Sequence, residues 1–138
     1  MSPEPQLFLD HWHRIVARRD LDALRAVLAD DVRLGAPPYW AKLEGKDVVC
    51  HLLGIVIHTI EDFTYRREWC NGAELALEFT GHVKGQDLQG IDLITLNAEG
   101  RISNLDVLMR PVNAIVALRE TIAPKMAAFL AERSGNAA

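Results

Sequence analysis

Apolar residues recur at helical spacing at the start of the chain. Between Gln6 and Arg19 they leave a single apolar stripe, which predicts an amphipathic helix. Asp20 follows as the expected N-cap of a second helix, because its side chain can accept a hydrogen bond from a free backbone N–H group. Two helices joined so closely predict a helical hairpin. The stripe consists of Leu7, Phe8, Trp12, Ile15 and Val16, and the inner face of the second helix of Leu21, Leu24, Val27 and Leu28.

A short strand is expected next, at residues 30–34. The sequence Gly35-Ala-Pro-Pro ends it, since consecutive prolines cannot donate the hydrogen bonds of a central strand. Residues 35–45 are therefore predicted to form a loop or a strand edge. Tyr39 and Trp40 lie in this loop, where they either cover the edge of the core or form the rim of a pocket.

A third helix is expected from Val48 to about Ile60, and its apolar residues all round predict burial on more than one side. The pattern then changes to the period of two that is typical of strands. Phe63–Trp69 is rich in β-forming residues, Asn71-Gly72 is a two-residue turn signal, and Leu75–Phe79 alternates with one buried face. The stretch Gly81–Gly85 is expected to interrupt the strand.

The stretch Gly90–Pro111 predicts a hairpin with its turn at Asn97–Gly100. Asp92 is a single acid in the apolar run of its first strand. On the second strand Leu105, Val107 and Met109 share one face, while Asn104 and Asp106 lie on the other. A terminal helix is expected from Val112 to about Arg133, with Pro124 as a break or a fresh start.

Helices followed by an antiparallel meander predict a single α+β domain over residues 1–138. A curved, mostly antiparallel sheet wrapped around the N-terminal helices would enclose an apolar cavity, the usual setting of a small-molecule site. A second apolar row on the sheet, with Ile91 and Leu93, would need a cover. We therefore expect a homodimer.

Three stretches carry a family resemblance: D-L-D-A-L-R-A-V-L-A-D-D-V (Asp20–Val32), L-E-G-K-D-V (Leu43–Val48) and I-D-L-I-T-L-N-A-E-G-R-I (Ile91–Ile102). In this order they resemble the nuclear transport factor 2-like superfamily, which includes SnoaL-like polyketide cyclases, limonene-epoxide hydrolases and ketosteroid isomerases. The resemblance implies a cone-shaped α+β fold, frequent homodimers and an apolar pocket. It implies no single activity, because function belongs to the site and not to the fold.

Residue by residue the resemblance is partial. Asp92 matches the position at which ketosteroid isomerases carry an acid that donates to the developing oxyanion. Their tyrosine on the first helix corresponds to Trp12, and their proton-shuttling aspartate corresponds to Ala36. Limonene-epoxide hydrolases need an Asp-Arg-Asp relay, one acid of which would fall at Val107. Of these catalytic groups, Asp92 is the one that carries over.

Composition narrows the function classes. The chain has 138 residues, of which 49% are hydrophobic and 25% charged, as in ordinary globular domains. A net charge of −4 without a basic run argues against nucleic acid as a partner. No apolar stretch approaches the roughly 20 residues that span a membrane. The acidic start M-S-P-E-P-Q is unlike a secretory signal, and Cys50 and Cys70 lack metal-ligand spacing, so a cytoplasmic location is expected.

Asp92 shares its strand face with Ile94 and Leu96, so it should point where these apolar side chains point. Burial makes an unpaired carboxylate costly and raises its pKa. Asp92 is then either a neutral donor or a base in a pocket. Alternatively it is a structural acid that accepts hydrogen bonds from Trp12, Arg101 or backbone amides.

The histidines and the known motifs add little chemistry. His13 could approach the cavity, although exposure is the alternative. His51 and His58 lie two turns apart on the third helix, as a surface or interface stripe or with one of them in a pocket. The sequence contains no HExxH, cysteine cluster, P-loop, G-x-S-x-G or dinucleotide fingerprint, so no metal and no cofactor are expected.

Two function classes stay open for a SnoaL-like protein that binds a small hydrophobic molecule. One is a cofactor-free isomerase, cyclase, dehydratase or hydrolase, with Asp92 as its catalytic acid or base and a pocket shaped by Trp12, His13, Tyr39 and Trp40. The other is a non-catalytic ligand-binding or dimerisation module. A second polar group facing Asp92 would favour the enzyme, because acid–base chemistry usually needs two positioned groups.

Overall fold

A computed structural model describes residues 5–136 of the chain. Its elements are α1 (Pro5–Arg18), α2 (Leu21–Val27), β1 (Leu28–Gly35), β2 (Leu43–Glu44), α3 (Lys46–Thr59), β3 (Glu61–Asn71), β4 (Glu74–Val83), β5 (Gln86–Leu96), β6 (Ile102–Arg110) and α4 (Val112–Asn136). Within residues 5–136, no helix combines the length and the apolar character needed to cross a membrane.

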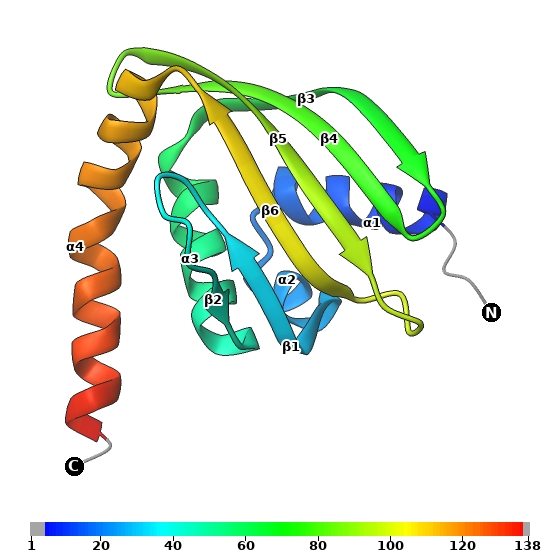
Figure 1. Cartoon of the computed structure of the whole chain (residues 1–138), viewed down its shortest axis with the longest axis horizontal. Coiled ribbons are helices and arrows are strands. Elements are labelled where there is room, and N and C mark those ends of the chain that lie inside the picture. Colours follow the sequence, from blue (N-terminus) through cyan, green and yellow to red (C-terminus); the bar gives the residue numbers. More distant parts are fainter. Residues whose placement is uncertain (1–4, 137–138) are drawn as a thin grey trace.

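The six strands form one curved sheet in the order β2-β1-β6-β5-β4-β3. Every neighbouring pair is antiparallel except β1 and β6, which are parallel. Figure 1 shows α1, α2 and α3 under the concave side of the sheet, with α4 descending beside it from the end of β6. The predicted α+β class, with a mostly antiparallel sheet around the N-terminal helices, is confirmed.

The N-terminal helical hairpin has the buried stripe and the N-cap that its sequence predicts. The buried face of α1 consists of Phe8, Leu9, Trp12 and Ile15. The carboxylate of Asp20 caps α2 by accepting a hydrogen bond of 3.1 Å from the backbone N–H of Ala23. Leu28, expected on the inner face of this helix, instead opens β1 and is fully buried there.

The expected interruption at Gly81–Gly85 is confined to the last two residues of that stretch. β4 continues through Gly81, and its turn to β5 lies at Lys84 and Gly85, both of which have positive φ. Gly81 is needed inside the strand, because a Cβ there would meet the side chain of Ile60 and lie 3.0 Å from the carbonyl oxygen of Glu61. This glycine therefore permits a close approach of β3 to β4 and does not end the strand.

The expected break at Pro124 is wrong, since α4 is continuous with Pro124 inside it. A proline removes one helical N–H donor, but packing on both sides can keep the helix going. The first half of α4 is anchored in an apolar cluster of Ile60, Phe79, Val83, Leu88, Ala114, Ala117 and Leu118. The helix is thereby held against the end of the sheet.

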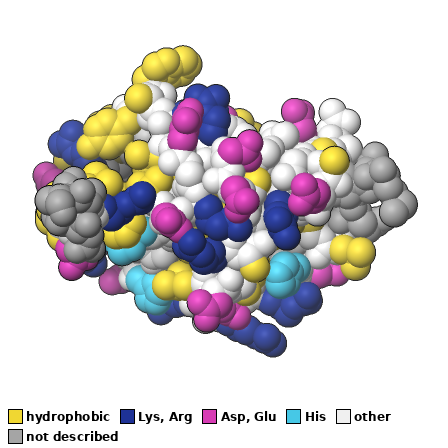
Figure 2. Space-filling view, turned by 90° about the horizontal axis from the view of Figure 1, so that it is seen from below, with side chains coloured by type: hydrophobic (Ala, Val, Ile, Leu, Met, Phe, Trp, Pro, Cys, Tyr) yellow, Lys and Arg dark blue, Asp and Glu magenta, His cyan; other side chains and the backbone are white. Residues whose placement is uncertain are grey.

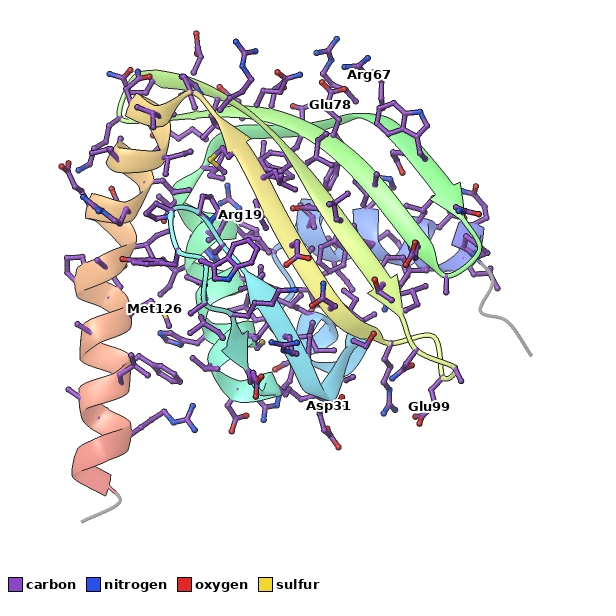
Figure 3. The ribbon with its side chains drawn as sticks, in the orientation of Figure 1. Arg19, Asp31, Arg67, Glu78, Glu99 and Met126 are labelled. Atoms are coloured by element: carbon purple, nitrogen blue, oxygen red, sulfur yellow. The ribbon has the colours of Figure 1, made fainter. Side chains whose placement is uncertain are left out.

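The convex face of the sheet carries a buried acid, Glu78 on β4, of which 1% is exposed. The guanidinium of Arg67 donates to it from Nε at 2.5 Å and from Nη2 at 3.1 Å, and the amide of Gln89 donates at 2.5 Å. Figure 3 shows Arg67 and Glu78 together above the sheet, on the side away from the helices. These hydrogen bonds, led by those of Arg67, lower the pKa of Glu78 to about 2.

Gly90 on β5 allows Phe79 to lie flat over the neighbouring strand. The two residues are paired in the β4–β5 register, and the Phe79 ring occupies the space that a side chain at position 90 would need. A Cβ there would also lie 2.8 Å from the backbone oxygen of Leu108.

We predict that Gly90→Ala lowers the free energy of unfolding by about 1–3 kcal/mol, as is usual for overpacking a dense core. Urea denaturation measures the change. Gly72→Asn is the control, because Gly72 lies in a turn with φ of +63° and no atom near the added Cβ, and asparagine tolerates this conformation. Equal losses in both variants would contradict the proposed close packing.

Candidate functional site

An apolar cavity of about 540 Å³ lies on the concave side of the sheet. Its wall combines side chains from α1, from the loop between β1 and β2, from α3, from all six strands and from α4. The predicted row Leu105, Val107 and Met109 of β6 faces it, as do Ile122 and Met126 of α4. Figure 3 shows Met126 pointing from α4 toward the interior of the molecule. The volume is ordinary for a small-molecule site.

Asp92 contributes a carboxyl group to this wall. It lies on β5 between Leu77 of β4 and Val107 of β6, and 7% of it is exposed. Burial raises the pKa of Asp92 to about 7, against the opposing effect of a hydrogen bond from Tyr65. Both the neutral acid and the carboxylate are therefore populated near neutral pH.

A chain of two hydrogen bonds holds this acid. Trp12 Nε1–H donates to the hydroxyl oxygen of Tyr65 at 2.9 Å, and that hydroxyl donates to Oδ2 of Asp92 at 2.8 Å. Burial, followed by the charge of Asp92, raises the pKa of Tyr65 well above its ordinary value, so the phenol keeps its proton.

The direction of the chain is fixed by its chemistry when Asp92 is ionised. The indole of Trp12 can only donate and the carboxylate can only accept, so the single proton of the Tyr65 hydroxyl goes to Oδ2 of Asp92. Oδ1 takes no hydrogen bond from the described residues. Because every fully buried side-chain oxygen of these residues has a hydrogen-bond partner, Oδ1 is not fully buried and is open to the cavity. Any proton that Asp92 exchanges with a ligand passes through Oδ1.

The predicted site residues divide into two groups. Trp12, Tyr39 and Asp92 line the cavity. His13 and Trp40 lie outside its wall: His13 Nε2 is 2.8 Å from Glu68 Oε1, and Trp40 is 98% exposed. Both neighbours of Trp40 in its loop, Tyr39 and Ala41, line the cavity. Ligand binding by Trp40 and by His13 stays a prediction.

Tyr65 is the important residue that the sequence interpretation missed. The expected hydrogen-bond partners of Asp92 included Trp12 and Arg101. Tyr65 instead lies between Trp12 and the acid. Arg101 is exposed, with Nη1 3.6 Å from Oε2 of Glu99. A signal was present, because Phe63 and Tyr65 share the period-two face that strand β3 turns toward the cavity.

The two histidines of α3 lie outside the cavity, in a separate groove between α3 and α4. The ring of His51 stacks on Phe129 with centroids 3.9 Å apart, and His58 Nδ1 is 2.8 Å from the backbone oxygen of Gly54. In Figure 2 histidine side chains lie beside basic and hydrophobic ones on the side where α4 ends. Within residues 5–136 no three His, Cys, Asp or Glu side chains gather as metal ligands.

Comparison with known proteins gives a consistent result. The SnoaL-like domain matches residues 9–105. A steroid delta-isomerase from Pseudomonas aeruginosa is 34% identical, with a TM-score of 0.85 over 91% of this chain and 93% of its own. An uncharacterised bacterial protein with a cystatin-like fold from Silicibacter pomeroyi DSS-3 is 37% identical, with a TM-score of 0.85 over 92% of each chain.

A more distant structure, an NTF2-like protein of unknown function from Cytophaga hutchinsonii ATCC 33406, is 13% identical with a TM-score of 0.64. It covers 82% of this chain and 96% of its own, and it supports the fold alone. No curated protein matches the chain.

The raised pKa of Asp92 predicts a specific dependence of stability on pH. Between about pH 4 and about pH 7 the folded protein holds a proton on Asp92 that the unfolded chain has released. The contribution of this raised pKa to the free energy of unfolding is therefore complete below about pH 4. It is lost as the pH rises to about 7, and the loss is on the order of 4 kcal/mol.

We expect the free energy of unfolding of Asp92→Asn to lack this pH-dependent loss, because asparagine does not titrate. Urea denaturation at a series of pH values would show the wild type losing stability relative to Asp92→Asn across that range. Asp87→Asn, an exposed acid on the same strand, should follow the wild type. Parallel curves for wild type and Asp92→Asn would mean that the carboxyl group titrates normally.

Proposed function

The chain belongs to the SnoaL-like domain family of the nuclear transport factor 2-like superfamily, and from this premise we propose that it is a cofactor-free isomerase of small hydrophobic carbonyl compounds. The observation that carries the proposal is Asp92, a buried carboxyl group with a pKa of about 7 and one oxygen open to an apolar cavity. A general acid–base catalyst works best when its pKa lies near the working pH. We propose further that residues 1–138 act as one domain in the cytoplasm.

In the proposed reaction Asp92 moves a proton between two carbons of an unsaturated ketone. The Oδ1 carboxylate takes a proton from the carbon between the carbonyl group and the double bond, and the electron pair passes through the enolate. The neutral acid then returns the proton to the far end of the former double bond. Tyr65, supported by Trp12, stabilises the carboxylate at Oδ2 throughout.

The enolate oxygen would need a second polar group. The hydroxyl of Tyr39, in the loop between β1 and β2, lies in the cavity wall and is the candidate. The position that resembles the base of ketosteroid isomerases holds Ala36. Asp92 would therefore serve as both base and acid, unlike the arrangement in those enzymes.

The test substrates are 5-androstene-3,17-dione and the smaller ketone 3-cyclohexenone, whose isomerisation produces a conjugated enone with strong ultraviolet absorbance. Asp92→Asn should lower kcat/KM by at least about 100-fold, because it removes the acid–base group. Asp87→Asn is the matched control and should leave the rate unchanged. For the wild type, the rate should rise with pH through about 7 as Asp92 ionises.

Tyr65→Phe sharpens this experiment. Losing the hydrogen bond that stabilises the carboxylate should raise the pKa of Asp92 and move the rise in rate to higher pH. A full rate in Asp92→Asn would refute the proposed role of this acid. Tight binding of the ketones without turnover would favour the ligand-binding module.

We also propose that the protein is a homodimer that covers the convex face of the sheet. On this face Leu93 is 40% and Leu108 55% exposed, and Ile91 pairs with Leu108 across β5 and β6. Apolar rows in the middle of a sheet are ordinarily covered. A second copy of the chain can cover this apolar row, because a two-fold axis brings the same row of both subunits into contact.

Sedimentation velocity at micromolar concentration should show a dimer. Leu108→Lys should convert it to a folded monomer, because the interface would then bury an unpaired charge. Val116→Lys, an equally simple charge addition at an exposed position of α4, should remain dimeric. A monomeric wild type would remove this proposal and leave the isomerase proposal standing.

A further inference from the structure

Three charged side chains line the apolar cavity within the described part of the chain: Lys42, Asp92 and Arg119. They differ in their surroundings. Asp92 is buried at the sheet, whereas Arg119 on α4 is exposed. A molecule that fills the cavity would therefore meet Asp92 at its inner end and Arg119 where the cavity opens to solvent.

The charge of Lys42 is already neutralised. Its ammonium group lies 2.9 Å from Oδ1 of Asp106 and 2.9 Å from the amide oxygen of Asn104. Both partners belong to the outer row of β6, so they hold the positive charge away from the cavity interior. Lys42 can offer a hydrogen bond, but it has little net charge left to attract an anion.

Arg119 has no such partner. It takes part in no ion pair with residues 5–136. Its neighbours one turn away along α4 are Ile115, Val116, Ile122 and Ala123, none of which is an acid. A helical arginine ordinarily gains from an acid at one of these positions, whereas the adjacent Glu120 does not face it on the helix. Among residues 5–136 its guanidinium therefore has no ion-pair partner, and it lies on the wall of a mainly apolar cavity.

We propose that the cavity takes an amphipathic molecule with an apolar body and one anionic group, and that Arg119 binds that group. This inference rests on the proposed ligand site and names its substrate class. The planar guanidinium suits carboxylate, sulfonate and phosphate groups, to which it can donate two parallel hydrogen bonds. The chain carries a net charge of −4, so a local cation at the opening is what would draw an anion in.

The same arrangement fixes the orientation of the ligand. An anion beside Asp92 would raise the pKa of that acid further and oppose its ionisation. With the anionic group at Arg119, the apolar body extends inward, where burial of its surface favours binding. The end of the ligand far from its charge then reaches Oδ1 of Asp92. Arg119 is a specificity-determining residue in this arrangement.

Two fluorescent probes separate charge from apolar shape. 8-Anilino-1-naphthalenesulfonate is an anion, and N-phenyl-1-naphthylamine is the same ring system without the sulfonate. Titration of each probe gives its Kd, and competition between them shows whether they share one site. Arg119→Gln should weaken binding of the anionic probe roughly fivefold, as expected for one exposed charge-assisted contact, and change the neutral probe less than about twofold.

Two variants remove one positive charge elsewhere. Arg14→Gln lies on the exposed face of α1, and Lys125→Gln lies in the groove between α3 and α4. Neither should change the affinity for either probe. Arg119→Lys, which keeps the charge but loses the planar fork, should recover part of the affinity for the anionic probe. Thermal unfolding of each variant checks that it is folded.

An unchanged affinity of Arg119→Gln for the anionic probe would overturn the inference. So would an equal loss for both probes, which would indicate apolar packing of the arginine stem, or an equal loss in Lys125→Gln, which would place the anion in the other groove. Binding of the neutral probe alone refutes the anion preference and leaves the isomerase proposal intact. Failure of both probes to bind would remove the ligand cavity and this inference together.

Discussion

The burial of one carboxyl group against an apolar cavity, offset by a single hydrogen bond, is the constraint that organises this molecule. Asp92 has a counterpart in Glu78, which lies on the opposite face of the same sheet under the largely exposed side chain of Arg67. The two acids lie on neighbouring strands, where Leu77 pairs with Asp92. Glu78 receives a guanidinium and an amide and its pKa falls to about 2, whereas Asp92 receives only the Tyr65 hydroxyl and its pKa rises to about 7. Depth of burial and local partners together decide which acid can exchange protons near neutral pH.

That single hydrogen bond depends on the packing of the whole cone. Trp12 comes from the first helix, Tyr65 from the third strand and Asp92 from the fifth strand, so the chain of donors exists only when α1 is docked beneath the sheet. The stripe of apolar residues on α1 provides that docking. A cluster of this kind rigidifies the acid, because the indole of Trp12 can only donate, the carboxylate of Asp92 can only accept, and the Tyr65 hydroxyl links the two.

Much of this could be predicted from the sequence, because local patterns determine local structure. Helical spacing placed α1, alternation placed the cavity-facing row of β6, and one acid in an apolar run identified Asp92 as buried. Gly81 and Pro124 were misjudged, since strand continuity at a glycine and helix continuity at a proline depend on what packs beside them. Tyr65 was missed for a similar reason: alternation places it on the cavity face of β3, but its role depends on a contact with Asp92 across 27 residues of chain, which alternation does not report.

The region matched by the family model and the wall of the cavity do not end at the same residue. The matched region, residues 9–105, contains most of the helical hairpin, the acid and its two supporting donors. The cavity wall continues beyond it, through Met109 and one side of α4, where the unpaired Arg119 lies. Binding energy from remote parts of a substrate determines which molecule is positioned at the reacting group. In the proposed isomerase, selectivity would therefore come mainly from α4, and reactivity from the sheet.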